Sequence, residues 1–274
     1  MTLDRRRLLT LAAAAPVAAS LPRAAAAGPA ARLIDATWTR SGSGGDPDAG
    51  PWAAILSRRL TLAEDGVARF DYAGARADLP NLRAWLAAYT AVDPRGLTRG
   101  AQYAYWANLY NAVTVELMLE AWPVDTIKTV QGGLFNTGPW KKKTTAVAGV
   151  ALSLDDIEHG ILRPVFRDPR IHYAVNCASI GCPNLQPRPF ASATLEGVLE
   201  QAARDYVNDP RGARIEGGRL TVSSIYDWFQ EDFGGSEAGV LEHLRRYAEP
   251  GLRAALEGRS GYDRDAYDWA VNAS

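Results

Sequence analysis

Apolar residues at helical spacing dominate the pattern of the chain. The spacing predicts helices over residues 52–59, 79–89, 100–122, 153–163, 195–207, 224–233 and 240–247. The longest, 100–122, is apolar on most of its faces, so we expect it to be buried together with Asn108 and Asn111. An unpaired buried amide costs roughly 1–3 kcal/mol. These two side chains therefore either hold neighbouring backbone or face a site.

Strand patterns are short and few. Residues 143–152 predict a hairpin turned at Ala148-Gly149, and residues 213–222 predict another turned at Gly217-Gly218. Residues 171–176 read as a further strand. Because helices outnumber strands, we predict an α+β fold, a helix-rich single domain with a small, mainly antiparallel sheet.

The first 27 residues have the pattern of an export signal. A charged segment containing Arg5-Arg6-Arg7 precedes an apolar run, and alanines follow at 24–27. The arginines before Leu8-Leu9 resemble a twin-arginine signal, and an ordinary secretory signal remains the alternative. We expect residues 28–50 to form a flexible linker and residues 51–274 the folded domain. The predicted location is periplasmic or secreted.

Charge and hydropathy exclude several classes of protein. Net charge is −1 for the whole chain and −4 without residues 1–27, and 141–143 is its one run of lysines, so nucleic acid is not an expected partner. No other apolar run approaches the roughly 20 residues of a spanning helix, so no membrane span is expected after signal removal. The pattern requires no cofactor and no metal. No partner protein can be named.

Residues 172–183 hold both cysteines and one of the three histidines of the chain. Cys177 is a candidate nucleophile beside a glycine-containing turn whose amides would form an oxyanion hole. Export favours the alternative, a Cys177–Cys182 disulfide. Zinc is a third option, because His159 and His172 add ligand types, but the spacing is irregular. The residues leave these alternatives open.

The partner of Cys177 depends on the local structure. Side chains alternate along a strand, so His172 and Cys177 would lie on opposite faces. On the helix 153–163, Glu158 falls within the apolar face and His159 at its border, with Arg163 one turn further on. This favours His159 as the partner of the thiol. The alternative for the carboxylate is a structural ion pair.

Three separated motifs carry a resemblance to a known family. Residues 105–112 (YWANLYNA), 154–163 (LDDIEHGILR) and 172–183 (HYAVNCASIGCP), with 229–233 and 267–269 after them, resemble the domain of unknown function 547 family. The resemblance covers about residues 50–270. The family has been loosely grouped with papain-like and transglutaminase-like cysteine enzymes, which implies a related fold.

The resemblance also implies roles for site residues. Cys177 would be the nucleophile and His159 the base, with Glu158 or Asn108 orienting the imidazole or polarising a carbonyl. We expect the remaining polar motif residues to line the cleft as binding residues: His172, Asn111, Arg163 and Cys182.

The functional expectation is an exported cysteine-dependent hydrolase or acyltransferase. It would act on amide bonds through a Cys177 thioester, and location suggests peptides or other cell-envelope amides as substrates. The alternative is a non-catalytic envelope or binding domain with a structural Cys177–Cys182 disulfide.

Overall fold

The computed structural model describes residues 28–131 and 137–274. The predicted export signal, residues 1–27, lies outside the described residues. Helices predominate and the sheets are small, so the α+β prediction is confirmed. None of the described helices is long and apolar enough to cross a membrane.

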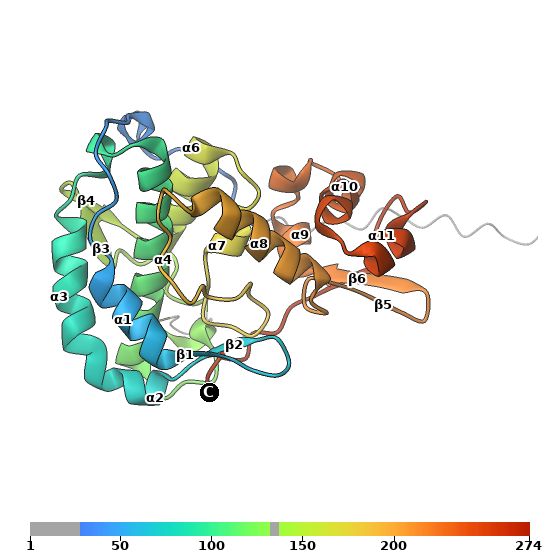
Figure 1. Ribbon diagram of the computed structural model, residues 1–274, viewed down its shortest axis with the longest axis horizontal. Coiled ribbons are helices and arrows are strands. Elements are labelled where there is room, and N and C mark those ends of the chain that lie inside the picture. Colours follow the sequence, from blue (N-terminus) through green and yellow to red (C-terminus); the bar gives the residue numbers. More distant parts are fainter. Residues whose placement is uncertain (1–27, 132–136) are drawn as a thin grey trace, which may run out of the picture.

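A long buried helix forms the centre of the larger part of the molecule (Figure 1). Helix α4 (Arg99–Ala121) begins at Thr98, whose hydroxyl accepts the Ala101 N–H. Helix α3 (Leu79–Thr90) packs beside it, and α1 (Gly50–Arg59) packs on α3. The predicted burial of α4 is confirmed, because most of its side chains are buried.

Short elements complete this part of the chain. They are η1 (Ala36–Thr39), β1 (Leu60–Leu62), β2 (Ala68–Phe70), α2 (Tyr72–Ala75), η2 (Arg76–Asp78), η3 (Pro94–Gly96), η4 (Ile127–Thr129), β3 (Thr145–Val147) and β4 (Val150–Leu152). The β3–β4 pairing confirms the first predicted hairpin.

The later chain builds a second group of elements at the other end of the molecule (Figure 1). They are α8 (Leu195–Asn208), β5 (Ala213–Glu216), β6 (Arg219–Ser223), α9 (Ser224–Trp228), η7 (Gln230–Phe233), α10 (Glu237–Tyr247), α11 (Pro250–Leu256) and β7 (Arg264–Ala266). Strands β5 and β6 form the second predicted hairpin, and β7 pairs with β6 in parallel. Their apolar faces share a buried cluster that includes Tyr226 and Phe233.

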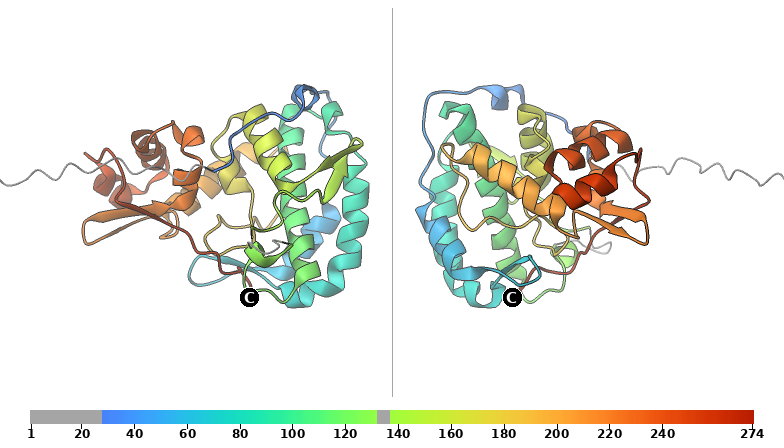
Figure 2. Two further views of the ribbon diagram at one scale, coloured as in Figure 1. Left: turned by 180° about the vertical axis from the view of Figure 1, so that it is seen from behind. Right: turned by 45° about the vertical axis from the view of Figure 1, so that its right-hand side comes forward.

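The segment 28–50 packs against the domain (Figure 2). Trp38 is buried, and the amide of Gly42 donates to the Leu97 carbonyl. These contacts make the segment part of the folded body, where the sequence analysis expected a flexible linker. An aromatic side chain in the core gives the free energy that orders a Gly/Ser-rich stretch.

The helix that carries Glu158 and His159 runs further than predicted. Elements α5 (Leu154–Ile157), η6 (Glu158–Leu162, a π-helical turn) and α6 (Arg163–Phe166) follow one another without a break. The predicted capping box of Ser153 and Asp156 is confirmed.

Pro164 does not end this helix because the carbonyls left without helical donors find partners. Proline has no N–H and leaves a carbonyl of the preceding turn unpaired. The amides of Arg32 and Ile34 donate to the carbonyls of His159 and Gly160 at 2.9 and 3.2 Å. The segment before α1 therefore stabilises the helix at the site.

The predicted strand over residues 171–176 is wrong. Residues Ile171–Ala174 form a single helical turn, α7, in which the His172 amide donates to the Pro169 carbonyl. Asn111 holds the end of this turn, because its amide group donates to the Ala174 carbonyl and its oxygen accepts the Asn176 N–H. A short apolar run is compatible with strand or helix, and these contacts decide for the helix.

Candidate functional site

A pocket of about 540 Å³ lies where the helix 154–166, α9, the loop 177–183 and the C-terminal segment meet. Its size suits a small molecule. Five predicted site residues line it together: Glu158, His159, His172, Cys177 and Cys182. Because residues 171–174 are helical, the alternation argument that separated His172 from Cys177 does not apply.

Both cysteines are free thiols. Their Sγ atoms lie 2.8 Å apart. The Cys182 sulfur accepts hydrogen bonds from the Cys177 N–H at 3.0 Å and from the Tyr267 hydroxyl at 3.1 Å. Cys177 Sγ also contacts Ser179 Oγ at 3.0 Å. In this structure the two cysteines are therefore free thiols whose sulfur atoms are in direct contact.

The two thiols are not equivalent electrostatically. Burial and the neighbouring Cys182 raise the pKa of Cys177. Burial acts on Cys182 in the same direction, but hydrogen bonds from Cys177 and Tyr267 outweigh it and lower the pKa of Cys182. Cys182 is therefore the more acidic member of the pair, because the hydrogen bonds that its sulfur accepts favour the charged form.

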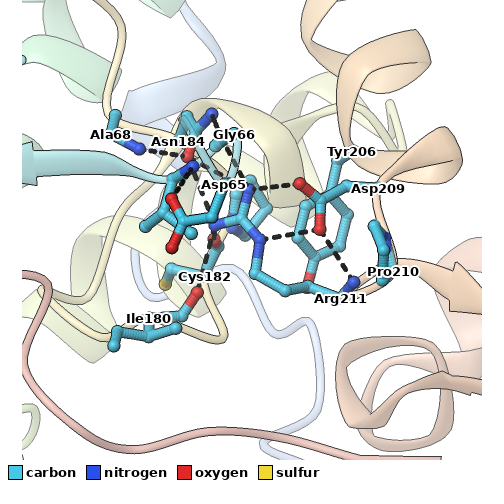
Figure 3. Close-up of polar contacts among 12 residues, drawn as sticks. Asp65, Gly66, Ala68, Ile180, Cys182, Asn184, Tyr206, Asp209, Pro210 and Arg211 are labelled. Atoms are coloured by element: carbon cyan, nitrogen blue, oxygen red, sulfur yellow. Dashed lines mark hydrogen bonds and ion pairs between the residues drawn. The ribbon is translucent and has the colours of Figure 1, made fainter. Parts of the chain in front are cut away.

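The loop 177–183 is called the thiol loop below. Residues at the end of α8 and in the α8–β5 connection bind its backbone carbonyl groups (Figure 3). The Arg211 guanidinium donates to the carbonyls of Ile180 and Cys182 at 3.1 and 3.2 Å. The hydroxyl of Tyr206 donates to the Gly181 carbonyl at 2.6 Å. Asp209 pairs with the guanidinium at 2.8 Å and fixes its plane.

The amide side of the same loop is paired with the C-terminal segment. The N–H groups of Ile180 and Gly181 donate to the carbonyls of Ala270 and Asp268, both at 2.8 Å. The Ala178 N–H donates to the Asn176 side chain at 2.8 Å. These three amides are engaged within the protein, so they do not form the oxyanion hole expected from the sequence.

A charged cluster lies beside the pocket and includes His172. Its Nε2 is 2.7 Å from Asp232 Oδ2, and its Nδ1 is 3.7 Å from Glu158 Oε1. Arg163 Nε also donates to Asp232, at 2.6 Å. The ring of Phe229 stacks on the imidazole with centroids 4.4 Å apart. His172 is thus fixed between two carboxylates.

Tyr110 connects this cluster to the thiols. Its hydroxyl is hydrogen-bonded to Glu158, and its pKa is raised by burial and by Glu158, Cys177 and Cys182. Burial raises the pKa of Glu158 as well. The phenol therefore stays protonated.

His159 is hydrogen-bonded to Arg163 and not to Cys177. Arg163 Nη1 lies 3.1 Å from His159 Nδ1, and since guanidinium only donates, Nδ1 accepts and a neutral ring carries its proton on Nε2. Burial and Arg163 lower the pKa of His159 to about 4. Within residues 28–131 and 137–274, no hydrogen bond joins a thiol to an imidazole.

The other predicted site residues lie outside the pocket wall. Asn108 pairs with both backbone groups of Phe190 at 2.9 Å, so it holds backbone. Asn111 does the same for the end of α7. The side chain of Arg163 is 1% exposed and bridges Glu231 and Asp232 behind the pocket.

Four residues of the site were not given roles by the sequence analysis: Tyr110, Arg211, Asp232 and Tyr267. Tyr110, Asp232 and Tyr267 fall within the motifs that carried the resemblance, which is the one signal that points to them. Among the described residues, no group of three or more His, Cys, Asp or Glu side chains is arranged to hold a metal ion.

The fold and the pocket define a helix-rich α+β domain with a thiol pair in a small-molecule pocket. Residues 94–207 match the family model described as protein of unknown function, DUF547, which supports the resemblance found in the sequence. The matched region contains α4, the helix with Glu158 and the thiol loop. No curated protein and no solved structure matches the chain.

Proposed function

We propose that the protein is a cysteine-dependent hydrolase or acyltransferase that acts on amide bonds through a thioester on Cys177. The observation that carries the proposal is the free thiol pair on the wall of the pocket. Cys177 is the more exposed of the two, and its sulfur is 2.8 Å from the sulfur of Cys182, whose pKa is lowered by hydrogen bonds. The pair therefore contains both a nucleophile and its proton acceptor.

The first step transfers the Cys177 proton to Cys182 Sγ as Cys177 Sγ attacks the carbonyl carbon. The hydroxyl of Tyr110, which lines the pocket, turns from Glu158 to donate to the developing oxyanion, a role the loop amides do not fill. The C–N bond then breaks, and the leaving nitrogen takes the proton from Cys182. Water or a second nucleophile releases the acyl group from the thioester and regenerates the thiol.

The test uses an activated aryl ester, because a good leaving group reports acylation before the natural amide is known. Intact mass and peptide mapping should find the acyl group on Cys177. Cys177→Ser should lower turnover by about a thousandfold or more, as removal of a nucleophile does. Cys182→Ser should slow acylation while the adduct still forms on Cys177.

A remote serine provides the control. Ser192 lies on the surface, bound to Asp46, and Ser192→Ala should leave turnover unchanged. Unchanged turnover in Cys177→Ser, or an adduct on another residue, would overturn the proposal. A protein that binds acyl compounds but is never acylated would support a non-catalytic binding domain.

We infer in addition that the protein is exported. The support is the N-terminal sequence, where three arginines precede an apolar run and a group of alanines. Intact mass of protein recovered from the periplasm or medium should correspond to a chain lacking about the first 27 residues. Full-length chain confined to the cytoplasm would contradict the inference.

A further inference from the structure

One wall of the pocket is aromatic. It consists of the half-buried side chains of Trp140, Trp228, Tyr267 and Trp269. The rings of Trp228 and Trp269 are stacked, with centroids 5.6 Å apart and planes at 27°. Trp140 stands edge-on to Trp269 at 5.7 Å, and Tyr267 packs on Trp269 at 4.6 Å. The rings support one another and form a surface suited to a flat apolar group.

The opposite wall is polar, and its side chains beside the thiols are largely removed from solvent: Glu158 is 9% and His159 is 10% exposed. Lys141 also lines the pocket, but its side chain is exposed. Burial raises the pKa values of Asp155 and Glu158, and burial lowers the pKa of His159 to about 4. Each of these changes favours the uncharged form. A ligand that brought its own charge into this space would meet the same desolvation cost.

Most of the polar atoms near the thiols already have partners. Tyr110 is bonded to Glu158, and His159 Nδ1 accepts from Arg163. The Tyr267 hydroxyl is bonded to Ser179 and to both sulfur atoms. A ligand rich in hydroxyl groups, such as a sugar, would find few free partners and would leave its own groups unpaired, at about 1–3 kcal/mol each.

We propose that the pocket binds an uncharged, planar aromatic acyl group, which stacks on the tryptophan wall and presents its carbonyl carbon to Cys177. The proposal rests on the proposed acyl-transfer function and names its substrate class. It replaces the expectation of peptides or other cell-envelope amides, which location alone suggested.

The experiment measures binding by calorimetry to the Cys177→Ser variant, in which no turnover interferes. The probes are 2-naphthamide, its 6-carboxylate derivative and N-acetylglucosamine. We expect 2-naphthamide to bind at least tenfold more tightly than either of the others. Tighter binding of the carboxylate or the sugar would overturn the proposal.

Matched substitutions locate the binding surface. Trp269→Leu, made in the same background, should weaken 2-naphthamide at least tenfold. Trp122→Leu removes a half-buried tryptophan that stacks on Tyr72 away from the pocket, at 5.3 Å, and should leave binding unchanged. Equal effects of the two substitutions would contradict the assignment.

The outcomes separate this proposal from the proposed function. If Cys177→Ser binds the neutral probe preferentially but no ester acylates the wild type, the proposed ligand class stands and the proposed enzymatic function is wrong. If aryl esters of 2-naphthoic acid and of charged aliphatic acids acylate Cys177 equally fast, the proposed enzymatic function stands and the proposed ligand class is wrong.

Discussion

The guanidinium of Arg211 should be essential for the stability of the thiol loop. Arg211→Met keeps most of the apolar stem and removes the donors to the Ile180 and Cys182 carbonyls. It also leaves Asp209 without its cation, and the two side chains of that pair are only 14% and 12% exposed. Removing one partner of a buried ion pair costs about 3–5 kcal/mol.

The assay is urea unfolding of the reduced protein, followed by circular dichroism. A loss of about 3–5 kcal/mol should also lower the melting temperature by roughly 6–20 °C for a chain of this size. Arg214→Met is the matched control three positions along, because Arg214 is 34% exposed and its carboxylate partner Glu216 is 74% exposed. That change should cost less than about 1 kcal/mol.

A lysine variant separates charge from geometry. Arg211→Lys keeps the charge but cannot form the planar set of bonds to Asp209 and two carbonyls, so it should recover only part of the loss. Equal midpoints for Arg211→Met and Arg214→Met would refute the argument that the guanidinium holds the loop.

Two further predictions concern the pocket. The lowered pKa of His159, about 4, means that the unfolded chain takes up a proton between pH 6.5 and 4 while the folded protein does not. His159 therefore lowers the free energy of unfolding as the pH falls, by on the order of 3 kcal/mol at pH 4. In urea titrations from pH 7 to 4.5, His159→Gln should lose less stability than the wild type. Gly181→Ala places a Cβ 2.7 Å from the Asp268 backbone nitrogen and should destabilise the protein by about 1–3 kcal/mol. Gly197→Ala, where a Cβ would meet open space, should be neutral or stabilising in the same unfolding assay. An unchanged pH profile, or equal effects of the two alanines, would contradict these expectations.

Local signals in the sequence were sufficient for the long elements. The period of apolar residues predicted α4 and α8, and the glycine pairs predicted the turn between β5 and β6. Each of these depends on residues close together in the chain. The capping box at Ser153 is of the same kind.

The short segment 171–174 could not be assigned in this way. Its helical turn depends on Asn111, which is 63 residues from the Ala174 carbonyl that it binds. That error had a functional consequence, because a strand would have kept His172 away from the thiols. Long-range partners decide the structure of such short runs.

The sequence predicted which residues line the site better than it predicted which of them are bonded to one another. Glu158, His159 and Cys177 do line one pocket, but His159 is bonded to Arg163 and Cys177 to Cys182. No local pattern relates Cys177 to Tyr267, which is 90 residues away. The polar network depends on tertiary packing, so it follows from the structure alone.

The most direct test of the account is site-resolved alkylation of the native protein with iodoacetamide, without reductant, across pH 5–10. We predict that both sulfurs are free to react and that Cys177 is labelled first because it is more exposed. We also predict that Cys182→Ser moves the labelling of Cys177 to lower pH, because it removes the neighbouring sulfur that raises the pKa of Cys177. Complete protection of both cysteines until a reductant is added would contradict the account. So would a pH dependence of Cys177 labelling that is the same in the wild type and in Cys182→Ser.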